Sequence, residues 1–142
     1  MTQSVTINLS TEPPSTNDLY VRLPRRVILS REYRRWRKVA DWEIHGQRPP
    51  KFKGPVEIVF TFGKTRKDPD NMIKSGTDAL VRLGVIEDDN PKIVRKVSIA
   101  IDESITGCRV TIASLEESHG FEPIGDAAAR VVERLKPRVA AE

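Results

Sequence analysis

Acidic side chains gather at high density between residues 66 and 89. This segment reads RKDPDNMIKSGTDALVRLGVIEDD, with Asp68, Asp70 and Asp78 followed by the acidic triplet 87–89. Carboxylates repel one another, so a group of them is stable when a bound cation compensates their charge. Mg²⁺ prefers carboxylate oxygens, and the segment contains no His or Cys of the kind that zinc favours. The pattern indicates magnesium-dependent chemistry.

Basic residues flank this acidic segment. Residues 13–53 carry 11 Lys and Arg against 4 Asp and Glu, whereas residues 63–103 carry 8 of each. A basic flank neutralises phosphates and releases counterions, while an acidic pocket beside it holds the cation. Charge alone leaves open the alternative of a solvated Arg-rich helix face without a ligand. The best candidates for contacts with phosphates are Arg25, Arg26, Arg34, Arg35, Lys64, Arg66 and Lys67.

The composition is that of one small globular domain. The chain has 142 residues, of which 38% are hydrophobic and 31% are charged, with a net charge of +4. No apolar run approaches the roughly 20 residues that cross a bilayer, and the first residues do not resemble a secretory signal. The single cysteine, Cys108, lies in an apolar run and is expected to be buried. We therefore expect a cytoplasmic protein without a membrane partner.

Hydrophobic alternation predicts the sheet that would position the acidic segment. Strands are expected at residues 5–9, 56–62, 93–101 and 108–113. The last two are expected to form a hairpin, because only a short polar segment joins them. The order of strands and helices predicts a small single α+β domain with a mixed or antiparallel four-stranded sheet packed by helices. This domain is expected to span residues 1–115, followed by a linker and packed helix at 116–142.

Two helices outside the acidic segment are expected from capping residues and periodicity. Ser30 is a suitable N-cap for a helix that runs to about His45. Trp36 and Trp42 are expected to pack this helix against the core. Asp126 could cap the last helix of the chain.

The acidic segment itself is predicted to contain a helix over residues 69–83. Asp68 is a suitable N-cap, Pro69 suits the first helical position, and Gly84 suits the left-handed residue that ends a helix. Helical spacing then places Asp70, Lys74 and Asp78 on one face, because each follows the previous one by four residues. The break at Gly84 is expected to turn the chain back, so that the acidic triplet 87–89 approaches the start of the helix.

The joint order of these features resembles the RusA-like Holliday-junction resolvases, small Mg²⁺-dependent endonucleases of bacteria, prophages and phages. The matching pattern is D-P-D-N at residues 68–71, then Lys74, then D-A-L at 78–80 and D-D at 88–89. Upstream, the family's P-P-S-x-N is matched by P-P-S-T-N at residues 13–17, followed by an Arg-rich stretch. The resemblance covers roughly residues 5–113, and its central block is quite specific.

This resemblance implies a function, a cofactor and roles for individual residues. It implies an endodeoxyribonuclease that resolves Holliday junctions by paired symmetric nicks in DNA recombination and repair. It also implies a homodimer, because a four-way junction requires two related nicks. The implied cofactor is Mg²⁺, with Mn²⁺ as a substitute. The implied metal ligands are Asp68, Asp70 and Asp89, the essential lysine is Lys74, and the supporting residues are Asn71, Asp78 and Asp88.

Two other classes of function are compatible with parts of the pattern. One is a non-catalytic protein that binds branched DNA and retains the fold, although every candidate acid and the lysine are present. The other is a nucleotide-sugar transferase that uses D-x-D to hold a metal. The short chain, the basic flank and the lack of a Gly-rich phosphate loop argue against the transferase.

Overall fold

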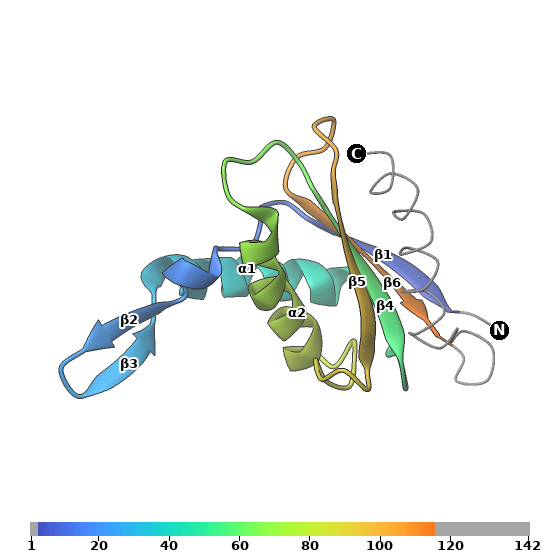
Figure 1. Ribbon diagram of the computed structural model, residues 1–142, viewed down its shortest axis with the longest axis horizontal. Coiled ribbons are helices and arrows are strands. Elements are labelled where there is room, and N and C mark those ends of the chain that lie inside the picture. The colour runs from blue at the N-terminus through green and yellow to red at the C-terminus, as the bar shows by residue number, and fades with distance from the viewer. Residues whose placement is uncertain (1–2, 116–142) are drawn as a thin grey trace, which may run out of the picture.

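A four-stranded mixed sheet forms the centre of the computed structural model, which describes residues 3–115 (Figure 1). Its strands are β1 (Ser4–Leu9), β4 (Val56–Phe62), β5 (Val94–Ile101) and β6 (Cys108–Ser114). Their spatial order is β1-β6-β4-β5; β6 is antiparallel to both β1 and β4, whereas β4 and β5 are parallel. With two helices, the chain is the small α+β protein with a mixed four-stranded sheet that its periodicity predicts.

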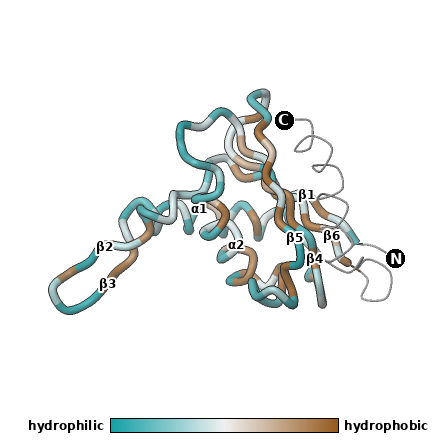
Figure 2. Tube along the Cα trace, in the orientation of Figure 1, coloured by the Kyte–Doolittle hydropathy of each residue, from teal (hydrophilic) through white to brown (hydrophobic). Residues whose placement is uncertain are grey.

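Strand β4 lies in the interior of this sheet because one of its faces is fully apolar. Val56, Ile58, Phe60 and Phe62 alternate along it and are all completely buried. A strand with this pattern needs neighbours on both edges and helices on the apolar face. Helices α1 and α2 both lie on one side of the sheet and supply that cover (Figure 1). The hydropathy colouring shows hydrophobic residues along the strands of the sheet and along α2 (Figure 2).

The expected hairpin between β5 and β6 is wrong. The segment 102–107 joins the two strands, but β4 lies between them and pairs with both. The acidic helix carries the chain from β4 back to the start of β5, which makes these two strands parallel neighbours. Strand β6 then pairs with the other edge of β4. Adjacency in sequence favours a hairpin, but β4, which has one completely buried apolar face, takes the position between the two strands.

Helix α1 (Arg31–Gln47) begins as predicted, with the Ser30 hydroxyl accepting a hydrogen bond of 3.1 Å from the Tyr33 backbone N–H. Trp36 is buried, as expected, and donates from its indole to the Thr11 carbonyl at 3.3 Å. The expectation for Trp42 is wrong, because its side chain is 79% exposed. It lies outside the helical stripe of Tyr33, Trp36, Ala40 and Ile44 that faces the core.

The acidic helix is divided into a 3₁₀ turn, η2 (Pro69–Met72), and an α-helix, α2 (Ile73–Arg82). Gly84 ends it with φ +74°, the left-handed conformation expected there. The Arg82 guanidinium pairs with both carboxylate oxygens of Asp41, with Nε at 3.1 Å from Oδ2. This bidentate pair joins α2 to α1 and fixes how the acidic helix lies on the domain.

Between β1 and α1 the chain forms an arm that extends away from the sheet (Figure 1). It consists of a 3₁₀ turn, η1 (Thr16–Asp18), and a two-stranded antiparallel hairpin, β2 (Tyr20–Leu23) with β3 (Arg26–Leu29). Leu19 at its base is completely buried, whereas most of the hairpin is exposed. The weak alternation of this Arg-rich stretch therefore corresponds to a hairpin packed only at its base.

Two further expectations concern single segments. Cys108 is buried, and this burial raises the pKa of its thiol to about 12, so it is not a reactive thiolate. Within residues 3–115, no helix is long and apolar enough to cross a membrane. The helix and linker expected at 116–142 lie outside the described residues.

Candidate active site and basic surface

Asp68 and Asp70 lie where the chain leaves the carboxyl end of β4 and enters the acidic helix. Asp68 has the extended backbone of an N-cap and its carbonyl accepts from the Asn71 N–H at 3.0 Å. Its carboxylate makes no capping hydrogen bond, which differs from the capping role expected for it. Both carboxylates are on exposed residues, and no protein partner for either occurs within residues 3–115. Two such carboxylates one residue apart are suited to a hard cation.

The backbone around this acidic pair is held by the preceding loop. The Thr16 hydroxyl donates to the Asn71 carbonyl at 2.8 Å, which ties η1 to η2. The Ser75 hydroxyl is buried and donates to the Pro14 carbonyl at 3.0 Å. The P-P-S-T-N segment therefore packs against the start of the acidic helix. Asn71 takes part in these contacts through its backbone, and the supporting role that the resemblance implies for it stays a prediction.

Lys74 lies in the first turn of α2, four residues after Asp70 in η2. Its ammonium is 3.6 Å from Oδ2 of Asp78, in the predicted i to i+4 arrangement. An exposed pair of this kind contributes little to stability, on the order of 0.3–0.5 kcal/mol. The Lys74 side chain is half exposed, so its ammonium is accessible to an anionic ligand.

The acidic triplet lies in the loop between α2 and β5. The Asp88 carboxylate accepts from the Asp89 N–H at 2.7 Å and from the Asn90 side chain at 2.9 Å, and these bonds lower the pKa of Asp88. Glu87 accepts from the Gly54 N–H at 2.7 Å and so ties this loop to the start of β4. Glu87 and Asp88 are thus engaged in loop structure, and the Asp89 side chain also contacts the Asp88 carboxylate.

The expected approach of the acidic triplet to the helix start within one chain is wrong. In the unit formed by β4, α2 and β5, Asp68 and Asp70 follow the carboxyl end of β4, whereas Asp89 precedes the amino end of β5. Because the two strands are parallel, these positions lie at opposite ends of the strands. A strand of eight residues is about 26 Å long. Within residues 3–115, no three His, Cys, Asp or Glu side chains converge on a metal site.

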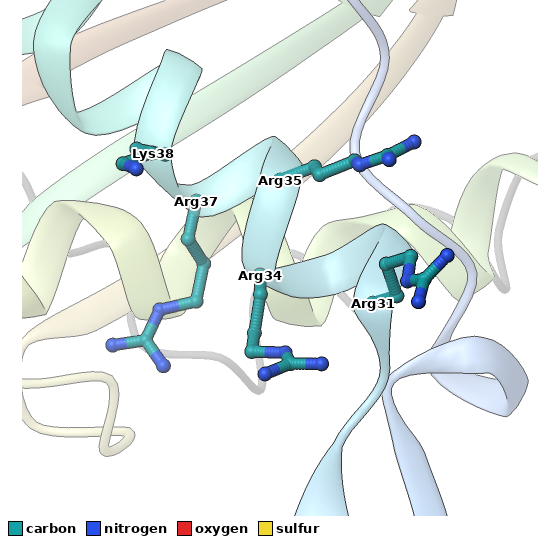
Figure 3. Close-up of a pocket in the computed structure, with 5 residues that line it drawn as sticks. All are labelled: Arg31, Arg34, Arg35, Arg37 and Lys38. Carbon is teal, nitrogen blue, oxygen red and sulfur yellow. The ribbon is translucent and has the colours of Figure 1, made fainter.

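A basic surface covers one side of α1. Arg34 and Arg35, predicted as phosphate contacts, line a cavity of about 440 Å³ with three further cations that the prediction did not include. Figure 3 shows Arg34 and Arg37 extending to the same side of the helix, while Arg35 extends away from them. Helical spacing from Arg34 would have identified the missing cations. We call this set the α1 basic surface; it comprises Arg31, Arg34, Arg35, Arg37 and Lys38.

The α1 basic surface continues toward the acidic pair. Arg35 also lines a second cavity, of about 380 Å³, together with Lys67 from the loop before Asp68. Lys67 is 3.7 Å from both Glu12 and Glu32, so it is paired with carboxylates as well as near this cavity. Lys64 and Arg66 are exposed in the same loop, and Arg25 and Arg26 are exposed on the arm. A polyanion on this side would extend from the arm toward Asp68 and Asp70.

Comparison with known proteins identifies the family of this chain. The family model described as Endodeoxyribonuclease RusA matches residues 11–113, from the segment after β1 almost to the end of β6. A search of curated proteins found no match. Members of this family are endodeoxyribonucleases that act on branched DNA, resolve Holliday junctions and generally depend on divalent metal ions. The matched range covers most of the chain, and the chain belongs to the RusA endodeoxyribonuclease family.

Proposed function

We propose that this protein is a Mg²⁺-dependent, structure-selective endodeoxyribonuclease that resolves Holliday junctions by paired symmetric nicks and acts as a homodimer. The observation that carries the proposal is the acidic pair Asp68 and Asp70, which has no protein partner within residues 3–115 and adjoins the α1 basic surface. We place its action in recombination and repair of DNA in the bacterial or phage-infected cytoplasm. Mn²⁺ is expected to replace Mg²⁺.

The donor set fits a magnesium ion. Mg²⁺ is usually held by one or two carboxylates together with substrate phosphates and water, and Asp68 and Asp70, separated only by Pro69, supply such carboxylates. Asp89 is proposed as a further ligand. When bound, the ion supplies charge neutralisation at the scissile phosphate and lowers the pKa of a bound water. The exposed position of these carboxylates is compatible with simultaneous contact to a DNA strand.

The remaining residues position the DNA for hydrolysis. Lys74, which pairs with Asp78 in α2, is proposed to contact a phosphoryl oxygen or to orient the attacking water. The α1 basic surface is proposed to bind the phosphates that flank the cut. Arg25 and Arg26 are proposed to contact phosphates of the same DNA duplex that lie farther from the cut. These contacts bind the backbone without reading bases, which suits selection by DNA shape.

Cleavage of synthetic DNA tests this proposal. A four-way junction, a flap and a linear duplex of matched sequence are incubated with the protein in Mg²⁺, in Mn²⁺ and in EDTA. We expect paired nicks in the four-way junction with either metal, little cutting of the linear duplex, and none in EDTA. Junction binding with no cutting of any substrate in either metal would instead identify a non-catalytic branched-DNA-binding protein.

Salt dependence tests the role of the α1 basic surface. For duplex DNA, each phosphate contact makes the slope of log K against log salt concentration more negative by about 0.9. Replacing both Arg34 and Arg35 with Gln should therefore make this slope less negative by about 2. Binding to all DNA sequences should weaken to the same extent. The matched control is Arg109→Gln, which removes one cation from the half-buried side of β6 opposite Cys108 and Val110. Equal slopes for all three proteins would remove α1 from the DNA surface.

A further inference from the structure

Trp42 is the most exposed large hydrophobic side chain of the described part of the chain, at 79%. The other tryptophan, Trp36, lies six residues earlier in the same helix, is buried, and donates from its indole to the Thr11 carbonyl. Within residues 3–115 the Trp42 indole has no such partner. A tryptophan stabilises a fold by burying its large ring and pairing its N–H. Trp42 does neither in this part of the chain, so its ring is available to a ligand.

Trp42 lies on the side of α1 that points away from the core. Residues three or four apart share a helix face, and steps of this size connect Trp42 with Lys38, then with Arg35 and Arg31. The buried stripe of α1 occupies the opposite side of the helix. The exposed ring is therefore aligned with three of the five cations of the α1 basic surface.

Three cavities around α1 are connected through the residues that they share. Lys38 lines the cavity of the α1 basic surface and also a cavity of about 410 Å³ that is lined by Val39 and Trp42. Val39 also lines the cavity that contains Lys67. The surface around Trp42 thus continues along α1 to the loop that directly precedes Asp68.

The charge around Trp42 favours an anionic ligand. Among the described residues, Lys38 is the charged residue that lines the Trp42 cavity, and no acidic side chain lines it. The two acids that neighbour Trp42 in sequence are engaged elsewhere. Asp41 pairs with Arg82, and Glu43 accepts from the Ser10 hydroxyl at 3.0 Å. An exposed aromatic ring beside cations suits a nucleotide, whose base stacks on the ring while its phosphates meet the cations.

We propose that Trp42 is a stacking platform for an unstacked base of a branched DNA substrate, and that it contributes to the selection of junctions over linear duplexes. The proposal rests on the function proposed above and extends it to a residue outside the predicted site. The phosphates of the same strand would lie on Lys38 and Arg35, on the way to the loop before Asp68. This continuity favours a DNA strand over an acidic peptide as the ligand.

A branched substrate supplies bases that such a ring can bind. Each base inside a linear duplex is stacked on both faces, and taking it out of the stack costs least where the base is already unpaired or mismatched. Base pairs at a branch point lose a stacking neighbour, so their bases are exposed at lower cost. Every base has a π-face, so stacking on an aromatic side chain tolerates any sequence. Trp42 would therefore select the structure of the DNA rather than its sequence.

Substitutions at Trp42 test this role through binding, measured in EDTA so that no DNA is cut. Trp42→Ala should weaken binding of a four-way junction by about 5- to 150-fold, the effect of losing one stacked base. Binding of a linear duplex should change by less than about twofold. Trp42→Phe keeps a flat aromatic ring and should retain most of the junction affinity. Trp42→Leu keeps an apolar side chain without a ring and should behave like Trp42→Ala.

Tryptophan fluorescence reports the same contact directly. The chain contains two tryptophans, and Trp36 is buried. Trp42→Phe therefore leaves Trp36 as the single emitter and serves as the reference. We expect a four-way junction to quench the wild-type emission strongly and a linear duplex to quench it weakly. Neither DNA should quench Trp42→Phe appreciably. In the free wild-type protein, acrylamide should quench the Trp42 emission readily.

The outcomes separate this proposal from the proposed function. Equal junction affinities for the wild type and all three variants would overturn the stacking role, as would an equal loss of affinity for junction and linear duplex in Trp42→Ala. A Trp42 emission that acrylamide cannot reach in the free protein would show that another segment or a second copy covers the ring, which also overturns it. Junction cutting with unquenched Trp42 would refute stacking alone. Quenching by junctions that are never cut would support stacking and refute the proposed nuclease.

Discussion

Replacing Asp70 with Asn is expected to abolish junction cleavage while junction binding remains. The substitution keeps the size of the side chain but removes the charge through which it would hold a metal ion. Metal assistance contributes several kcal/mol to such a reaction, and each 1.36 kcal/mol corresponds to a factor of ten in rate. We therefore expect single-turnover cleavage to fall by about a thousandfold or more. The α1 basic surface is unchanged, so the affinity for a four-way junction in EDTA should stay within about twofold, or 0.4 kcal/mol.

The matched control for this variant is Glu57→Gln. It also removes one negative charge, but from the face of β4 opposite the buried Ile58 and Phe60. This variant should cut at the wild-type rate. Wild-type cleavage by Asp70→Asn would contradict the assignment of the site, and an equal loss of cleavage in both variants would show that net charge is responsible.

Replacing Gly107 with Ala is expected to destabilise the fold strongly. Gly107 has φ +81°, and an added Cβ would lie 2.2 Å from the Leu9 carbonyl oxygen and 2.6 Å from backbone atoms of Ser10. The left-handed conformation costs a non-glycine residue about 1–2 kcal/mol, and overpacking adds about 1–3 kcal/mol. The free energy of unfolding should fall by about 2–5 kcal/mol, with Tm lower by roughly 5–20 °C.

The control for this variant is Gly46→Ala in α1. An added Cβ at Gly46 meets no atom within 4 Å, and Ala favours the helix by about 0.5–1 kcal/mol. Tm should therefore rise slightly in this variant. An unchanged Tm in Gly107→Ala would mean that the connection between β5 and β6 does not pack on the end of β1 as described.

Local patterns in the sequence predicted those elements whose signals lie within the element itself. The Ser30 cap and the stripe that contains Trp36 predicted α1, and the alternation from Val56 to Phe62 predicted β4. Gly84 correctly predicted the end of the acidic helix. The spacing of Lys74 and Asp78 predicted their ion pair, because helical geometry alone places residues four apart on one face.

Features that depend on long-range topology could not be predicted in this way. The β5–β6 hairpin was wrong because the competition for the edges of β4 involves strands more than 30 residues apart. The approach of Asp89 to Asp70 was wrong within one chain because a crossover from β4 to a parallel β5 separates their ends. Trp42 was misplaced because its size predicts burial more strongly than its position on the helix does.

Calorimetric titration of Mg²⁺ and Mn²⁺ into the wild-type protein and into Asp70→Asn, each with a four-way junction present, tests the central claim most directly. The claim is that Asp68, Asp70 and Asp89 hold a divalent ion against the DNA backbone. We expect saturable metal binding to the wild-type complex and a loss of that binding in the variant. Indistinguishable titrations for the two proteins, or no binding of either metal to the wild-type complex, would contradict it.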